Sequence, residues 1–189
     1  MRRRALLPLR LLYHQLVILR WKIAGPPRIL RYGRELNAKI LRAFGAEVGR
    51  REVAVQSPIT LHEVGKDYRN LVIHDEVLLN GNNFLDLSER IVLEKGVSIG
   101  PGVVIMTHNW YNNNTFLVDT LPHTCGKKPV RIGEGTGVKA GALIVMGVII
   151  GRNVVVAGNT VVNRDLPDNC FAAGVPARIV RTFSEPKTE

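Results

Sequence analysis

The feature that most constrains this chain is a six-residue repeat between Ile132 and Pro167. Every sixth position is isoleucine or valine, namely Ile132, Val138, Ile144, Ile150, Val156 and Val162. An amphipathic helix needs apolar spacings of three and four, and a half-buried strand needs a spacing of two. A spacing of six is typical of a parallel β-helix, in which each hexad forms a short strand and a turn. With three hexads per coil, the stacked aliphatic residues predict a three-sided prism with a continuous core.

A second stretch in the same register lies upstream. It contains two sets of aliphatic positions separated by a two-residue slip: Ile73, Leu79, Leu85 and Ile91, then Leu93, Ile99 and Ile105. Residues 48–72 contain scattered aliphatic residues in no clear register. Residues 106–131 contain no hexad, and a long loop inside a compact repeat is usually functional or disordered. We therefore predict a loop at about 106–131 that projects from one edge of the coil.

The segment after the repeats carries a specific motif. Residues 163–181 read NRDLPDNCFAAGVPARIVR, in which Ala173-Gly174-Val175-Pro176 follows Asp165 and Pro167. With the hexads, this segment resembles the hexapeptide-repeat acetyltransferases of the galactoside, maltose and nodulation-factor type. The resemblance implies an all-β, left-handed parallel β-helix with N-terminal helices. The left hand comes from the resemblance alone, because parallel crossovers are otherwise right-handed.

Positive charge is concentrated near the N-terminus. Residues 1–34 contain nine of the 26 Lys and Arg residues and no acidic residue, so the rest of the chain is nearly neutral. A nucleic-acid-binding domain is expected to carry a basic face on its folded body, and we predict no nucleic-acid partner. Cys125 and Cys170 are too few for a disulfide framework or a metal cluster. They suit a reducing compartment such as the cytoplasm.

Residues 1–25 predict a basic, apolar helix. Its longest uncharged run is too short to span a bilayer, and no signal-peptide cleavage site follows. Apolar and polar side chains share one side of the helical wheel, so the helix is not cleanly two-faced. These residues are Leu7, Arg10, Leu11, His14, Ile18 and Trp21. Two interpretations stay open: peripheral contact with the anionic inner surface of a membrane, or packing on the coil or another subunit.

The rest of the chain divides into three segments. Residues 26–47 predict a capping helix that starts at Pro26-Pro27, stops at Gly45 and covers the open end of the coil. Residues 48–182 predict the β-helix domain. Residues 183–189 form a C-terminal tail.

His108, in the sequence IMTHNW, directly follows the last hexad before the loop. A rigid coil would fix its backbone, and an imidazole can take and return a proton near neutral pH. By resemblance, His108 stands where the family has its general base. The other histidines lack this context, and we predict structural or surface roles for them. They are His14, His62, His74 and His123.

Acceptor contacts are implied less directly. Asn83 and Asp86 lie at the coil corner where the related enzymes hold acceptor hydroxyls, although the spacing departs from theirs. Both residue types also suit simple turns. Trp110 and Tyr111 begin the loop, followed by Asn112 to Asn114. This mixture of flat apolar faces and amides suits a carbohydrate, so we predict Asn83, Asp86, Trp110 and Tyr111 as acceptor-binding residues.

The resemblance assigns acetyl-CoA to the later coils. Small residues there let the pantetheine arm approach the backbone, and arginines can meet its phosphates. The predicted cofactor-binding residues are Ala140, Gly158, Asn163, Arg164, Arg178 and Arg181. The resemblance also implies a homotrimer, in which donor and acceptor meet between adjacent coils.

The implied function is an acetyl-CoA-dependent O-acetyltransferase that modifies a sugar, or a glycan precursor in polysaccharide modification. His108 would deprotonate the acceptor hydroxyl, and a backbone N–H would stabilise the oxyanion, without a metal or a covalent intermediate. A serine or antibiotic O-acetyltransferase is an alternative. So is a non-catalytic structural coil. A zinc carbonic anhydrase of the γ type needs three convergent histidines, and the histidine spacing here does not resemble that set.

Overall fold

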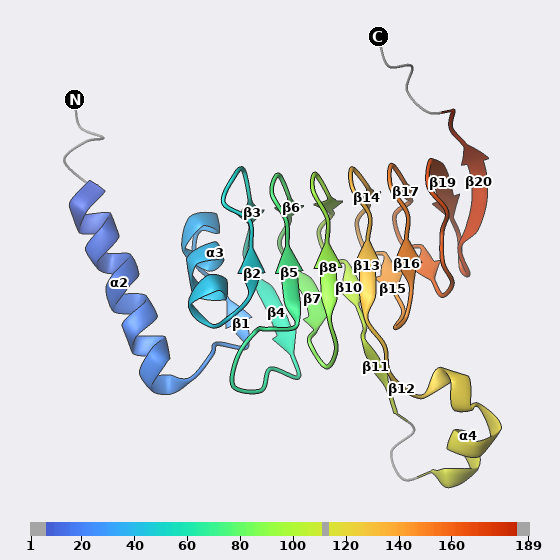
Figure 1. Ribbon diagram of the computed structural model, residues 1–189, viewed down its shortest axis with the longest axis horizontal. Coiled ribbons are helices and arrows are strands. Elements are labelled where there is room, and N and C mark those ends of the chain that lie inside the picture. The colour runs from blue at the N-terminus through green and yellow to red at the C-terminus, as the bar shows by residue number, and fades with distance from the viewer. Residues whose placement is uncertain (1–6, 111–113, 185–189) are drawn as a thin grey trace.

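The computed structural model describes residues 7–110 and 114–184. Its strands form three sheets that make the sides of a prism (Figure 1). Sheet A contains β1 (Ile29–Leu30), β4 (Ile59–His62), β7 (Asn83–Asp86), β10 (Val104–Ile105), β15 (Leu143–Ile144) and β18 (Val161–Val162). Sheet B contains β2 (Glu47–Val48), β5 (Leu71–Ile73), β8 (Ile91–Leu93), β13 (Val130–Ile132) and β16 (Ile149–Ile150). Sheet C contains β3 (Ala54–Val55), β6 (Leu78–Leu79), β9 (Ser98–Ile99), β14 (Gly137–Val138), β17 (Val155–Val156), β19 (Cys170–Ala173) and β20 (Arg178–Thr182).

Successive coils pair in parallel, as a β-helix requires. The register joins residues one coil apart, for example Val138 with Val156 and Ile144 with Val162. Within sheets A, B and C, the described antiparallel pairs lie at the ends, where β1 joins β4 and β19 joins β20. The predicted hexad residues line the interior, and all of them are at most 1% exposed. The three-sided aliphatic core is therefore confirmed.

The two-residue slip in the upstream register has a simple geometric cause. In β8, Ile91 and Leu93 both point inward and Val92 points outward, because side chains alternate along a strand. The slip therefore adds a second inward residue to one side of the coil without breaking the stack. Close stacking also requires small corner residues. A Cβ on Gly133 would lie 2.6 Å from the backbone of Gly151 in the next coil.

The coil begins earlier than its hexads indicated. In the stretch without clear register, β3 pairs with β6 and β4 pairs with β7. Val55, Ile59 and Leu61 are at most 1% exposed and extend the core. A loop at residues 63–70 interrupts the register after β4. Its Tyr68 is buried, and the hydroxyl donates to the carbonyl of Pro27 at 2.6 Å.

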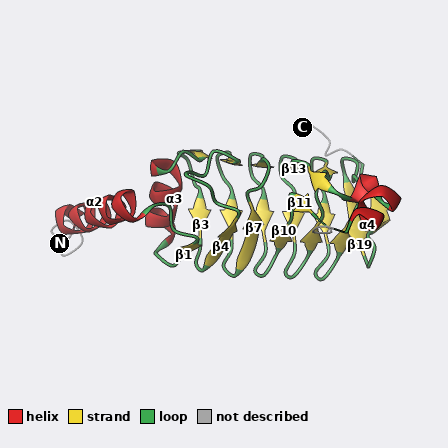
Figure 2. Cartoon of the chain, turned by 90° about the horizontal axis from the view of Figure 1, so that it is seen from below, coloured by secondary structure: helices red, strands yellow, loops and turns green. Residues whose placement is uncertain are grey.

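Within the described residues, two helices precede the coil. Helix α2 (Leu7–Ala24) and helix α3 (Arg34–Ala43) lie at the N-terminal end of the solenoid in both views (Figures 1 and 2). Helix α3 buries Leu36, Ile40 and Leu41 against the first coil. The predicted helix start at Pro26-Pro27 is wrong, because the chain first forms β1 and α3 begins only after Gly33. Within the described residues, no helix is long and apolar enough to cross a membrane.

The predicted projecting loop is an arm with its own structure. Strands β11 (His108–Asn109) and β12 (Gly126–Lys127) form an antiparallel pair at its base. Helix α4 (Thr115–Thr120) and the 3-10 turn η1 (Pro122–Thr124) lie farther out. Figure 1 shows this arm extending from one edge while β13 continues the coil. The hairpin therefore holds His108 at the junction of arm and solenoid.

Candidate active site

His108 and Asp86 form a close pair at the corner between sheets A and B. Asp86 ends β7, and His108 starts the arm just after β10, which is the next strand of sheet A. His108 Nδ1 lies 2.6 Å from Asp86 Oδ2. Asp86 is fully buried, whereas 19% of the His108 side chain is exposed. An ionised carboxylate can only accept, so His108 donates from Nδ1 and keeps its lone pair on Nε2.

Thr107 and Ser88 complete the surroundings of the Asp86 carboxylate. The backbone N–H groups of Thr107 and His108 donate to Asp86 Oδ2 at 2.8 and 2.9 Å. The Thr107 hydroxyl lies between the Asp86 backbone carbonyl, at 2.7 Å, and Oδ2, at 3.0 Å. The Ser88 hydroxyl and N–H donate to Oδ1 at 2.8 and 3.1 Å. Burial of Asp86 would by itself raise its pKa. The hydrogen bonds from His108, Thr107 and Ser88 outweigh that effect and hold the pKa well below its usual range.

His62 is the neighbour of this pair in the preceding coil. It lies opposite Asp86 in the β4–β7 register, and its ring is parallel to that of His108 within 8°, with centroids 5.7 Å apart. His62 Nδ1 is buried 3.6 Å from Asp86 Oδ1 and has no hydrogen-bond partner among the described residues. Phe84 also lies beside His62, at a ring-centroid distance of 5.3 Å. The sequence predicted a structural or surface role for His62 and did not indicate its position beside His108.

His62, Asp86 and His108 are residue types that bind metals, and their ligand atoms lie within 4.8 Å of one another. The carboxylate is nevertheless fully occupied by hydrogen bonds. Oδ2 accepts from Thr107 and His108, and Oδ1 accepts from Ser88. A metal ion would have to displace several of these donors to reach a lone pair. The geometry therefore favours a hydrogen-bond network that orients His108, and it does not favour a metal centre.

The predicted acceptor residues lie in different surroundings. Asn83 is 1% exposed; its amide donates to the Asn80 carbonyl, and its oxygen accepts from the Val103 N–H. These bonds favour a structural role at the coil corner. Asp86 has no exposed surface, so it faces His108 and not a bound acceptor. Trp110 is 54% exposed beside β11, and Tyr111 lies outside the described residues.

The six residues predicted to bind the donor are all exposed and lie in three places. Ala140 and Gly158 share the corner between sheets C and A, Asn163 and Arg164 follow β18 at the corner between sheets A and B, and Arg178 and Arg181 lie on β20. The first two are in adjacent coils, where the Asn159 N–H donates to the Ala140 carbonyl at 2.9 Å. A single chain therefore does not gather all six at one edge.

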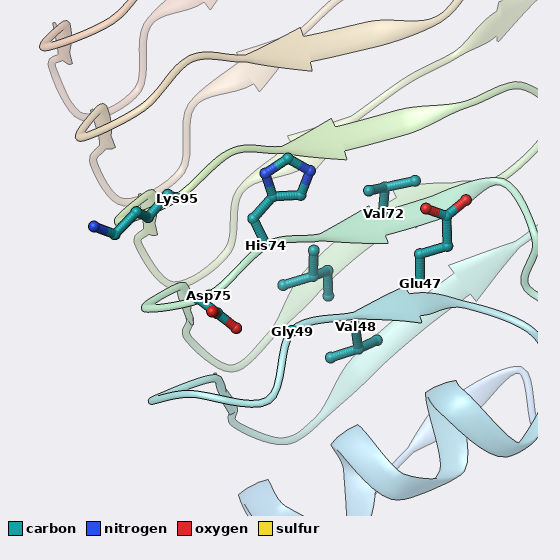
Figure 3. A pocket seen from close by; sticks show the side chains of 8 residues that line it. Glu47, Val48, Gly49, Val72, His74, Asp75 and Lys95 are labelled. Carbon is teal, nitrogen blue, oxygen red and sulfur yellow. The ribbon is translucent and has the colours of Figure 1, made fainter.

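Two surface hollows lie at different distances from the His108–Asp86 pair. A hollow of about 490 Å³ lies over β2 and β5, where the side chains of Glu47, His74, Asp75 and Lys95 are found (Figure 3). It includes neither His108 nor Asp86. A smaller hollow of about 260 Å³, here called the polar hollow, includes Ser88 and Lys127. Its other lining residues are Glu63, Gly65, Lys66, Asp67, Arg69, Asn70 and Leu87.

The polar hollow adjoins the His108–Asp86 pair. Ser88 Oγ lies 3.0 Å from His108 Nδ1, and Lys127 is the register partner of His108 in the β11–β12 hairpin. Most of its lining comes from the 63–70 loop, which had no readable pattern in the sequence. Two residues that sequence reasoning missed lie close to a predicted one: His62 is one coil before Asp86, and Ser88 follows Asp86 by two positions.

The geometry thus defines a hexapeptide-repeat β-helix with a histidine–carboxylate pair at one edge. No protein-family model matches the chain. The galactoside O-acetyltransferase of Escherichia coli is 37% identical over 114 residues, which cover 56% of this chain and 54% of that protein. A putative acetyltransferase of Saccharomyces cerevisiae is 33% identical over 116 residues, covering 61% and 58%. The chain therefore spans somewhat more than half the length of these curated relatives.

A solved structure is similar over more of the chain. The hexapeptide-repeat-containing acetyltransferase of Vibrio cholerae, in complex with acetyl coenzyme A, superposes with a TM-score of 0.64. It is 28% identical, and the match covers 78% of this chain and 76% of that one. The predicted resemblance is confirmed: by sequence and by fold the chain is similar to the hexapeptide-repeat acetyltransferases. Its three-sided coil matches their left-handed parallel β-helix.

Proposed function

We propose that this protein is an acetyl-CoA-dependent O-acetyltransferase in which His108 is the general base. The observation that carries the proposal is the 2.6 Å contact between His108 Nδ1 and the buried Asp86 carboxylate. This contact fixes both the tautomer and the orientation of the imidazole, as a general base requires. The acetyl-CoA bound to the Vibrio cholerae structure and the acetyltransferase names of the relatives support the donor.

The reaction follows from the lone pair on His108 Nε2. This nitrogen takes the proton of an acceptor hydroxyl as the hydroxyl oxygen attacks the thioester carbonyl carbon. The tetrahedral intermediate then collapses, the carbon–sulfur bond breaks, and His108 returns the proton to the leaving thiolate. Asp86 stabilises the imidazolium between the two transfers, because its buried carboxylate is ionised. Neither a metal nor a covalent intermediate on Cys125 or Cys170 is needed.

For the acceptor, we propose a hydroxyl group of a sugar or glycan precursor bound in the polar hollow. Its lining offers carboxylate, ammonium, guanidinium and amide groups, which can each bond a hydroxyl-rich ligand. Exposed Trp110, at the end of the hairpin that carries His108, adds a flat apolar face. Asp86 acts in this scheme by positioning His108, and Asn83 supports the corner. Tyr111 stays a prediction, because it lies outside the described residues.

For the assembly, we propose a homotrimer with the donor site between adjacent chains. The exposed donor residues support this arrangement, since they lie at two corners and on β20 of one chain and need a second chain to form a common cleft. Light scattering that gives a monomer mass at working concentration would contradict it. We also propose a cytoplasmic location, because both cysteines are free.

The test of the function is release of coenzyme A thiol from acetyl-CoA with a panel of sugars, a lipid-linked glycan, serine and chloramphenicol. We expect acceptor-dependent release that is fastest with a saccharide. Preference for serine or chloramphenicol would leave the acyltransferase proposal intact and overturn the sugar acceptor. Absence of both thiol release and a thermal shift with coenzyme A would favour the non-catalytic coil.

A further inference from the structure

Helix α2 carries an uncovered apolar stripe. Its residues alternate spacings of three and four, so they fall on one side of the helix, and each is at least 52% exposed. We call them the α2 stripe: Leu9 at 64%, Leu12 at 52%, Leu16 at 56%, Leu19 at 54% and Ile23 at 83% exposed. Monomeric folds seldom leave such a continuous set of leucines in water. The stripe therefore indicates a surface that something covers.

The opposite side of α2 is fixed to the protein. His14 is buried and lies 3.1 Å from the ammonium group of Lys39 on α3. The Trp21 indole N–H donates to the Tyr32 hydroxyl at 3.0 Å. Arg10 forms an ion pair with Glu35 at 2.5 Å. These contacts set the rotation of α2 about its axis, so the stripe faces away from α3.

The mixed side of the helical wheel noted in the sequence is not the side that carries the stripe. Leu7, Leu11, Ile18 and Trp21 share the side of Arg10 and His14, which made the helix look poorly segregated. In the structure, Ile18 and Trp21 pack partly buried against the core, so this mixed side is the inner one. Helix α2 lies beyond α3 at the end of the solenoid (Figure 2). The clean apolar stripe is thus on the outer side.

Charge distinguishes the possible occupants of the stripe. Alternating spacings of three and four also occur in coiled coils, where the flanking positions pair acids with bases between helices. Here the positions beside the stripe are Tyr13 and Arg20 on one side and Gln15 and Lys22 on the other. None is acidic, and residues 1–25 contain no acidic residue at all. Two copies packed along this seam would bring like charges together without a counter-charge.

We propose that α2 lies on an anionic lipid bilayer, with the stripe at the boundary between headgroups and acyl chains. Arg20 and Lys22 flank the stripe and would contact lipid phosphates, while Tyr13 suits the interface. Basic groups near an anionic bilayer strengthen such contact, and salt screens it. This inference is independent of the proposed acetyl transfer, because no residue of the stripe lies in the His108 site.

The test is cosedimentation of the full chain with phosphatidylcholine vesicles, with and without phosphatidylglycerol. We expect binding to the anionic vesicles that falls as salt rises. Leu12→Ser with Leu16→Ser should lower the vesicle-bound to free ratio at least about tenfold. Arg20→Gln with Lys22→Gln should weaken binding to anionic vesicles only. Phe116→Ser is the matched control, because Phe116 is an apolar side chain with 71% exposure outside α2.

Circular dichroism and thiol release in solution check that each variant stays folded and keeps its transferase activity. Full vesicle binding by the leucine variant would overturn the proposal, as would a wild-type chain that ignores anionic vesicles. If the leucine substitutions instead reduce the mass measured by light scattering, a second copy covers the stripe, and the lipid proposal is wrong. A failure of thiol release with intact vesicle binding would count against the transferase proposal alone.

Discussion

The early and late coils of the solenoid bury different chemistry. The late coils, residues 130–167, follow the hexad closely, and the buried polar side chains described there are the hydroxyls of Thr136 and Thr160. The early coils, residues 47–108, bury Asn83, Asp86 and Thr107. A buried carboxylate is far more costly than a hydroxyl unless it is well paired. The comparison teaches that regular repeats build the scaffold, and that departures from the repeat mark the site.

Replacing His108, in the early coils, should cause the largest loss of turnover. His108→Ala removes the proposed base, so turnover should fall by about two orders of magnitude or more. Coenzyme A binding should hardly change, because the predicted donor residues lie elsewhere. The measurement is thiol release at saturating acetyl-CoA. His74→Ala, an exposed histidine of the same coils, is the control. Equal rates for the wild type and the His108 variant would refute the assignment.

Replacing Asp86 should affect both activity and stability. In Asp86→Asn, an amide NH2 must face donors that now point at a carboxylate oxygen, and the tautomer of His108 is no longer fixed. We expect turnover to fall about 10- to 100-fold and the free energy of unfolding to fall by about 3 kcal/mol. Asp168→Asn is the matched control in the late half. Its carboxylate is 41% exposed and pairs with Arg152, so its loss should cost less than about 1 kcal/mol.

The pH dependence of stability sharpens the Asp86 prediction. The pKa of Asp86 is lower in the folded chain than in the unfolded chain, so its stabilising effect is complete above the unfolded value, about pH 4. The effect declines as the pH falls from there toward the folded value. The stability difference between wild type and Asp86→Asn should therefore be constant near neutral pH and shrink in acid. A difference that grows below pH ~4 would contradict the network.

A substitution in the late coils should lower the stability and leave the turnover nearly unchanged. Ile144 is fully buried in the hexad stack, so Ile144→Ala should cost about 2–5 kcal/mol of unfolding free energy. Turnover per folded molecule should stay close to that of the wild type, because the change lies in the scaffold. Ile149→Ala, with a side chain 51% exposed, is the control and should cost much less. Chemical denaturation measures both. A large loss of turnover in folded Ile144→Ala protein would show that scaffold and site are not separable.

The scaffold could be predicted from the sequence because the six-residue period follows from the geometry of the coil. A six-residue aliphatic spacing is typical of one fold, the parallel β-helix. The six hexad residues from Ile132 to Val162 all point inward, as expected. The first coil falls within the predicted domain of residues 48–182, but its register could not be read because the loop at 63–70 interrupts it between Leu61 and Leu71. Helix α3 was placed too early because Ile29 and Tyr32 fit the helical spacing that leads to Leu36, although Ile29 lies in strand β1.

The candidate site was predictable only in part. His108 was singled out by its place after a hexad and by its resemblance to the family's general base, and its catalytic role stays a prediction. Its contact with His62 joins residues 46 positions apart, and the intervening loop hides the coil register that aligns them. Asp86 was predicted beside the site, but its burial and its hydrogen bonds depend on the stack of three successive coils. The role of Asp86 therefore depends on its tertiary contacts, which cannot be read from a single sequence.

The smallest expected effect concerns His62, whose ring lies parallel to that of His108. Since Nδ1 is 3.6 Å from Asp86 Oδ1, too far for a hydrogen bond, its main contribution is the flat surface that limits rotation of the His108 ring. His62→Ala removes that surface, and turnover should fall by a few-fold, within about tenfold. His62→Phe keeps a ring beside both His108 and Phe84 and should recover most of the loss.

Turnover with both substrates saturating separates this effect from weaker binding. If His62→Phe is as slow as His62→Ala, a ring nitrogen of His62 takes part and packing alone is an insufficient account. If both variants match the wild type, the stacked ring has no role in holding His108. In that case the hydrogen bonds of Asp86 suffice to orient the base, and the functional departure from the repeat is confined to β7 and the start of the arm.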